Sequence, residues 1–198
     1  MLFNAKRQIS VRTIGDPVLS RIADPVLTVD AETVRLAAEM IDAMNVFNGI
    51  GLAAPQYGVP KRMVVIDVPA ESVEGTPSEG EEKLIPRMPL VLINPEILSY
   101  STRTASRDEG CLSVPDVFAP VERPEKVVLR SATLDGDVIE CECGGLLGRC
   151  IQHELDHLDG KLFTDRLAPE VAREVAGELN MLRKNGAKKS FLRTKKVK

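Results

Sequence analysis

The sequence predicts an α+β fold in which largely antiparallel sheets pack around a central helix, with a further helix towards each end of the chain. Short β-branched runs are joined as hairpins, amphipathic helices stand apart from them, and the two do not alternate. A length of 198 residues suits one domain with a buried core. We expect that domain over residues 1–186 and a basic, flexible tail over residues 187–198.

The first element is a helix predicted over residues 31–47. Asp30 is a suitable N-cap, and Asn48 and Gly49 are typical of a helix end. Between them, apolar residues recur with helical spacing at Val34, Ala37, Ala38, Ile41 and Met44.

Strands follow in two groups. Residues 62–68 and 90–94 are β-branched runs, and the stretch between them, residues 69–89, is rich in Pro, Gly and Glu, which predicts a mobile acidic loop. Residues 126–133 and 138–142 flank an Asp-Gly pair, which predicts a hairpin.

Two more helices are predicted in the last third of the chain. One begins after Gly144 and Gly145 and ends near Leu158, before an Asp-Gly pair. The other begins near Pro169 and ends before Gly186. Its apolar stripe consists of Val171, Val175, Leu179 and Leu182.

Composition excludes several classes of protein. Apolar residues make up 43% and charged residues 28% of the chain, and no apolar run is long enough to cross a membrane, so neither a disordered nor a membrane protein is expected. The basic start of the chain lacks a following apolar segment, which argues against a secretory signal and favours a cytoplasmic location. In that compartment the four cysteines, Cys111, Cys141, Cys143 and Cys150, are expected as thiols or metal ligands.

Charge is distributed unevenly along the chain. The net charge is −3, yet residues 183–198 carry eight positive charges and no acid, which leaves −11 on residues 1–182. A polyanionic partner would therefore meet the C-terminus alone, although a merely solvated tail has the same composition.

The two histidines of the chain, His153 and His157, lie four residues apart on the second predicted helix, with Glu154 directly after the first. At about 100° per residue both imidazoles share one face, as a metal-binding His-Glu-x-x-His motif requires. The opposite face is apolar and predicts that the helix packs into the core. Its residues are Leu147, Ile151, Leu155 and Leu158.

A third ligand must be Cys, Asp or Glu, because no third histidine exists. A protease-like site would use a downstream glutamate; Glu170, Glu174 and Glu178 are available, although their spacing is also typical of a solvated helix face. Cys150 lies on the histidine side of the same helix, where we favour a lining role over ligation. The alternating Cys141 and Cys143 suit a structural role.

Two other segments carry residues suited to chemistry. Cys111 follows Glu109 and Gly110, and glycine permits a close backbone approach to a thiolate ligand. A run of small residues at 49–54 precedes Pro55 and Gln56, which suits a loop that lies against a substrate and offers an amide donor.

Together these segments closely resemble the peptide deformylase family. GIGLAAPQ at 49–56, EGCLS at 109–113 and QHELDH at 152–157 are similar to its three signature motifs, in the same order, and the likeness extends over residues 10–167. Tyr57, the long segment at 69–89 and the basic tail depart from the family pattern.

The resemblance implies metal-assisted removal of the N-formyl group from the formyl-methionine of newly made polypeptides. Carried onto this chain, it implies that Cys111, His153 and His157 bind one divalent ion, natively Fe(II), replaceable by Ni, Co or Zn. A metal-bound hydroxide would then attack the formyl carbon, with Glu154 as general base and then acid. The Gln56 amide and the Leu112 backbone N–H would polarise the formyl oxygen.

Further expectations concern the substrate and partners. Substrate-binding residues are expected at Ile50, Gly51, Glu109, Leu146 and Cys150. The family works at the ribosome, so the basic tail could dock there, and no membrane partner is expected.

Two alternatives remain open from the sequence. One is a peptide-bond metalloprotease with a glutamate ligand. The other is a structural zinc site made by Cys111, Cys150, His153 and His157, in which Glu154 would be idle.

Overall fold

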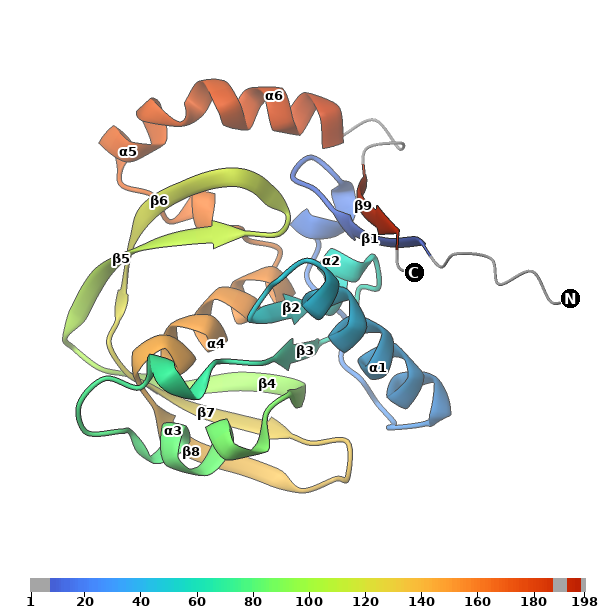
Figure 1. The fold of residues 1–198 in the computed structure, drawn as a ribbon, viewed down its shortest axis with the longest axis vertical. Coiled ribbons are helices and arrows are strands. Elements are labelled where there is room, and N and C mark those ends of the chain that lie inside the picture. The colour runs from blue at the N-terminus through green and yellow to red at the C-terminus, as the bar shows by residue number, and fades with distance from the viewer. Residues whose placement is uncertain (1–7, 187–191, 197–198) are drawn as a thin grey trace, which may run out of the picture.

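The computed structural model describes residues 8–186 and 192–196, which form helices and antiparallel sheets (Figure 1). The predicted α+β class is confirmed. The helices and strands are β1 (Gln8–Arg12), α1 (Ala31–Val46), β2 (Gly51–Ala53), α2 (Ala54–Tyr57), β3 (Met63–Ile66), α3 (Glu79–Leu84), β4 (Leu90–Tyr100), β5 (Thr104–Cys111), β6 (Val114–Pro124), β7 (Val127–Ala132), β8 (Val138–Cys143), α4 (Gly145–Leu158), α5 (Pro169–Glu174), α6 (Ala176–Gly186) and β9 (Leu192–Lys196). Single 3-10 turns lie at Pro17–Ser20, Ala70–Ser72, Ile85–Arg87 and Phe163–Asp165.

The main sheet has five strands in the order β2-β3-β4-β7-β8, and every neighbouring pair is antiparallel. The hairpin predicted between β7 and β8 is present. Its turn contains Gly136 at φ +85°, a conformation that glycine adopts without steric cost.

Helix α4 lies between this sheet and the two-stranded ribbon of β5 and β6 (Figure 1). Its apolar face packs against the alternate sheet residues Val64, Ile66 and Leu92. Burying a Leu or Ile side chain contributes roughly 1.5–3 kcal/mol, so this contact holds the helix firmly. The four residues predicted for this face are all buried, namely Leu147, Ile151, Leu155 and Leu158.

Helix α1 covers the opposite face of the same strands. Met40 and Met44 pack with Met63, Val65 and Ile93, which alternate along β3 and β4 with the residues that face α4. Strand β3 is thus buried on both faces, which explains its uninterrupted apolar sequence.

The ribbon of β5 and β6 was not expected from the sequence. Pro115, Pro120 and Pro124 lie in β6, and proline is usually excluded from central strands. In a two-stranded sheet each strand has one unpaired edge. A proline whose nitrogen faces that edge removes no hydrogen bond from the ladder. A register shift between Gly110 and Cys111 ends the regular pairing and sets Cys111 at the strand's end.

The expectation of a mobile loop over residues 69–89 is wrong for its second half, where α3 forms. Ser78 and Glu81 make a capping box: Ser78 N–H donates to Glu81 Oε2 at 2.8 Å, and Glu81 N–H donates to Ser78 Oγ at 3.4 Å. Gly144 N–H also donates to Ser78 Oγ at 2.9 Å, which fastens α3 to the start of α4.

The C-terminal part differs from the expectation in two ways. The single helix predicted after Pro169 is divided at Val175 into α5 and α6. Within the expected tail, β9 pairs antiparallel with β1, and Lys195 Nζ donates to the Val46 carbonyl at 2.7 Å. Residues 187–191 and 197–198 of the expected tail lie outside the described residues.

In the described part of the chain, no helix combines the length and the apolar character needed to cross a membrane.

Candidate metal and active site

Three side chains suited to metal binding meet where β5 ends against α4. Cys111, His153 and His157 each offer one ligand atom, and these atoms all lie within 4.8 Å of one another. Cys111 Sγ is 3.2 Å from His157 Nε2, and the two imidazole centroids are 5.0 Å apart. The helix supplies the histidines one turn apart, and the ribbon brings the thiol to them.

This donor set fits a divalent transition metal. One sulfur and two imidazole nitrogens are ligands that Zn²⁺ and Fe²⁺ accept, and they leave a position for water or substrate. His157 is buried, and burial together with the neighbouring His153 lowers its pKa, which favours the neutral form that coordinates. Burial also lowers the pKa of His153, but hydrogen bonds to Cys111 and Glu109 outweigh it and raise that pKa.

Cys150 is not a member of this ligand group. Its Sγ faces the Ile50 carbonyl at 3.6 Å, and burial raises the pKa of its thiol well above the usual value. The alternative glutamates, Glu170, Glu174 and Glu178, are exposed on α5 and α6. The geometry therefore supports neither the four-ligand zinc site nor the glutamate-ligated protease site.

Glu154 lies beside the ligands with one oxygen unengaged. The side chain is buried, and its Oε2 has no hydrogen-bond partner among the described residues. Burial raises the pKa of Glu154 to about 7, although the neighbouring His153 opposes the shift. A carboxyl group that titrates near neutral pH can take up and release a proton during turnover.

Glu109 organises the surroundings of His153. Its Oε2 is 2.9 Å from His153 Nδ1, and Arg123 donates two further hydrogen bonds to the carboxylate, at 2.6 and 2.9 Å. Burial raises the pKa of Glu109, but the bonds from His153 and Arg123 outweigh it and hold the pKa far below its ordinary value. A permanent carboxylate on Nδ1 leaves Nε2 of His153 free to bind an ion.

Sequence reasoning missed the charged groups around Glu109. Arg123 Nη1 donates to Asp156 Oδ2 at 2.8 Å, and Arg149 Nη1 donates to Glu109 Oε1 at 2.8 Å. Arg149 stands four residues before His153, so helical spacing alone could have placed it on the ligand face. The pairing of Arg123 depends on the β5–β6 ribbon and had no signal in the sequence.

Gln56 is held with its amide nitrogen towards the site. Its Oε1 accepts from Ala53 N–H at 2.8 Å, which leaves Nε2 to donate to Ser113 Oγ at 3.2 Å, close to Cys111 Sγ at 3.5 Å. With 1% of its surface exposed, this amide has a fixed orientation.

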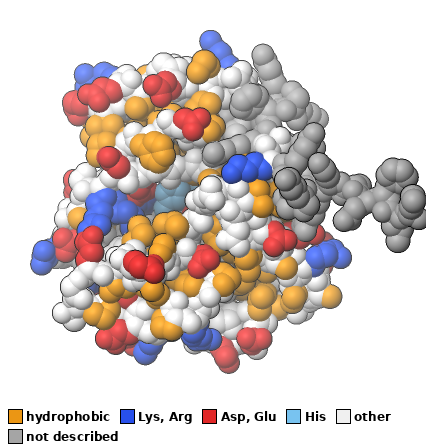
Figure 2. Space-filling model, viewed as in Figure 1, with side chains coloured by type: hydrophobic (Ala, Val, Ile, Leu, Met, Phe, Trp, Pro, Cys, Tyr) orange, Lys and Arg blue, Asp and Glu red, His pale blue; other side chains and the backbone are white. Residues whose placement is uncertain are grey.

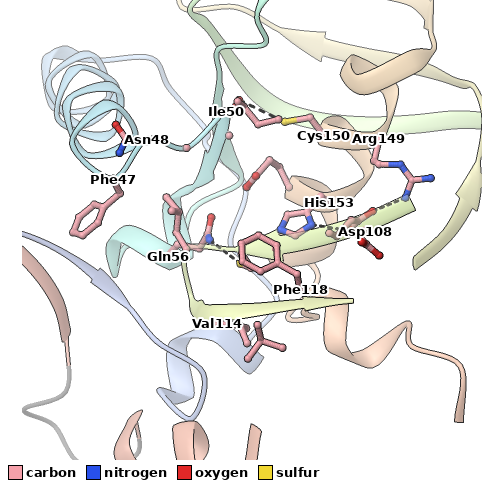
Figure 3. Close-up of a pocket in the computed structure, with 18 of the residues that line it drawn as sticks. Phe47, Asn48, Ile50, Gln56, Asp108, Val114, Phe118, Arg149, Cys150 and His153 are labelled. Atoms are coloured by element: carbon pink, nitrogen blue, oxygen red, sulfur yellow. Dashed lines mark hydrogen bonds and ion pairs between the residues drawn. The ribbon is translucent and has the colours of Figure 1, made fainter. Parts of the chain in front are cut away.

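A cavity of about 360 Å³ opens beside these groups. Figure 3 shows Gln56, Phe118 and His153 around one space, and Figure 2 shows a histidine in a hollow of the surface. The expected substrate-binding residues Ile50, Gly51, Glu109, Leu146 and Cys150 all line it, as do Cys111, Leu112, Gln56, His153 and Glu154.

Several residues of the cavity rim were not expected. Phe118 is 70% exposed, and its ring covers Gly110 so closely that a β-carbon there would collide with it. The other unexpected lining residues include Phe47, Asn48, Asp108, Asp116 and Val117.

Comparison with known proteins gives one consistent result. The family described as "Polypeptide deformylase" matches residues 9–173. Peptide deformylase 2 of Gloeobacter violaceus is 45% identical over 168 residues, which cover 85% of this chain and 83% of that protein. The peptide deformylase of Agrobacterium fabrum is 47% identical over 155 residues, 78% of this chain and 84% of that one. The crystal structure of peptide deformylase from Ehrlichia chaffeensis superposes with a TM-score of 0.78 at 33% identity and covers 92% of this chain and 99% of that one.

Proposed function

Because the chain belongs to the polypeptide deformylase family, we propose that it hydrolyses the N-formyl group of formyl-methionine at the start of newly made polypeptides and releases formate. The observation that carries the proposal is the meeting of Cys111, His153 and His157 beside the buried Glu154.

Cys111, His153 and His157 would hold one divalent ion, natively Fe(II), with Ni, Co or Zn as substitutes. Such an ion, when bound, supplies a Lewis acid that makes water nucleophilic near neutral pH. The chemistry of the three donors supports this assignment.

Glu154 is proposed to move the proton. Its Oε2, which has no hydrogen-bond partner in the described part of the chain, and a pKa of about 7 suit a base that takes a proton from the attacking water. The same carboxyl group then gives that proton to the leaving amine, so Glu154 returns to its starting state.

Gln56 and the backbone N–H of Leu112 are proposed to stabilise the developing oxyanion. Both residues line the cavity, and the bond from Ala53 keeps Nε2 of Gln56 aimed towards Cys111. A donor held in advance is typically worth roughly 3–4 kcal/mol in the transition state.

The substrate would enter the cavity as an extended peptide. The cavity lies between β2, which is an edge strand of the main sheet, and the end of β5. An edge strand offers unpaired backbone groups to an extended chain. Ile50, Gly51, Leu146, Cys150 and the backbone at Glu109 would then surround the methionine side chain.

We further propose that the enzyme works in the cytoplasm and that its basic C-terminal residues dock it on the ribosome. The support is the eight positive charges after residue 182 on an otherwise acidic chain.

The test is release of formate from a formyl-Met-Ala-Ser peptide by protein loaded with Ni²⁺ or Fe²⁺. Acetyl-Met-Ala-Ser and unmodified Met-Ala-Ser serve as controls. Formate release from the first peptide alone is expected. Cleavage of the Met-Ala bond without formate would instead support a protease.

A further inference from the structure

Arg149 joins the two parts of the molecule that supply the metal ligands. It lies on α4, which carries His153 and His157, and its guanidinium reaches the ribbon that carries Cys111. Nη1 donates to Glu109 Oε1 at 2.8 Å and to the Val121 carbonyl at 3.0 Å, and Nη2 donates to the Ala105 carbonyl at 2.6 Å.

These contacts are buried and specific. Arg149 is 8% exposed, so its charge is held by an ion pair with Glu109 and by two carbonyl groups rather than by water. Two guanidinium nitrogens, held apart in a rigid plane, serve three acceptors on two strands, a spacing that the single ammonium nitrogen of a lysine does not match. Removing one member of such a buried pair leaves its partner uncompensated.

Glu109 uses all its acceptor capacity. Arg149 and Arg123 donate to Oε1, while Arg123 and His153 meet Oε2. Each oxygen therefore has two partners. Losing Arg149 leaves Oε1 with Arg123 as its one remaining partner, so the carboxylate can shift or take up water at Oε1, and His153 Nδ1 follows it.

We propose that Arg149 is a positioning residue of the metal centre: it fixes the Glu109 carboxylate, and through it the ring of His153, against the strand that ends in Cys111. The inference rests on the proposed function, because that function implies that a divalent metal ion is bound at this site. Arg149 also lines the cavity, but in this role it acts on the ion only through Glu109.

The experiment measures Co²⁺ affinity of metal-free protein by competition with a chelator, and follows thiolate-to-cobalt absorption. Arg149→Met is expected to bind Co²⁺ about 10–100-fold more weakly, the usual range for a partner of a metal ligand. Arg149→Lys should lose affinity as well. Arg107→Met is the matched control, because Arg107 lies on β5, is 54% exposed and pairs with Glu74; it should bind Co²⁺ like the parent protein.

A double-mutant cycle with Glu109→Gln separates positioning from general support of the fold. If Arg149 acts through Glu109, Arg149→Met should cost less than about threefold in Co²⁺ affinity in the Glu109→Gln background. Equal losses of Co²⁺ affinity from Arg149→Met in the two backgrounds would overturn the proposal. Unchanged Co²⁺ affinity in both Arg149 variants would overturn it too, and so would a loss in Arg107→Met as large as that in Arg149→Met.

Two further measurements keep the test decisive. If Arg149→Met or Glu109→Gln does not fold, the NMR resonance of His153 Nδ1 is compared between the parent and Arg149→Lys. A shifted resonance supports the proposal, and an unchanged resonance overturns it.

Formate release by the parent protein is measured separately. Its absence with a normal cobalt spectrum would reject the proposed function and leave the role of Arg149 standing.

Discussion

Gly51 and Glu154 approach so closely that a β-carbon on Gly51 would collide with Oε1 of the carboxylate and would lie 2.8 Å from Cys150 Sγ. Gly51 begins β2, whereas Glu154 lies on α4, so the absence of a side chain lets the edge strand lie directly beside the helix. Steric exclusion by Glu154 and Cys150 therefore explains the glycine at position 51.

Gly51→Ala should displace Glu154 and lower kcat by about 100-fold, since a shift near 1 Å in a reacting group costs that much. Steady-state formate release measures it. Gly177→Ala is the control. Among the described residues, apart from its own helix backbone and chain neighbours, no atom lies within 4 Å of the added carbon, and alanine in α6 should stabilise the fold by up to about 1 kcal/mol without changing kcat. An active Gly51→Ala would contradict the tight fit.

Glu154→Gln keeps the size of the side chain and removes its proton-accepting group. The variant should bind Ni²⁺ and substrate normally, while kcat falls by about 100- to 10,000-fold. Metal content and kinetics on a formyl-Met peptide test this together. Near-normal turnover would show that another group moves the proton.

Cys111→Ser should lose most of its metal, because a hydroxyl is a much poorer ligand than a thiolate. Cys150→Ser should keep its metal, since Cys150 Sγ faces the Ile50 carbonyl and stands outside the ligand group. Elemental analysis after dialysis distinguishes the two variants. The reverse result would show that the ligand assignment is wrong.

Gln56→Ala should lower kcat by about 100- to 1,000-fold with metal content unchanged, as expected for loss of one oxyanion donor. Ser113→Ala is its control, because it removes the hydroxyl that accepts from Gln56 Nε2 and keeps the amide. We expect Ser113→Ala to remain within tenfold of the parent. Equal losses in the two variants would indicate that Gln56 only supports the local structure.

Neutralising the basic tail should weaken ribosome binding without affecting hydrolysis of a short peptide. We choose Lys188, Lys189 and Lys198 for replacement by Gln, because Lys195 contacts Val46 and must be kept. Co-sedimentation with ribosomes is compared at low and raised salt, where counterion release predicts a steep dependence for the parent. Equal sedimentation of both proteins would remove the tail from any docking role.

The sequence predicted what local patterns encode. Helix α1, the β7–β8 hairpin and α4 follow from caps, apolar spacing and one Asp-Gly turn, and the His153–His157 spacing follows from helical geometry. What local patterns do not encode is the pairing of distant segments. The β5–β6 ribbon brings the partners of Glu109 together. Its strands contain prolines and charged residues that are atypical of β-strands, so the sequence pattern did not predict their pairing.

The error at residues 69–89 has a different origin. Composition alone predicts a solvated loop, but Ser78 and Glu81 stand at the spacing of a capping box. The short helix is stable because Gly144 N–H donates to Ser78, a tertiary contact 66 residues away that no local window contains.

The pairing of β1 with β9 also sets an order of events during synthesis. Strand β1 precedes β9 in the chain, so it leaves the ribosome well before its partner. Until β9 has been synthesised, one edge of β1 lacks its partner strand. Lys195 is also not yet present to donate to the Val46 carbonyl at the end of α1. The loop-closure cost grows only logarithmically with the length of chain between the two strands, so waiting adds little free energy. The main sheet and α4 can therefore assemble first, and closing the two-stranded sheet is a late step of maturation.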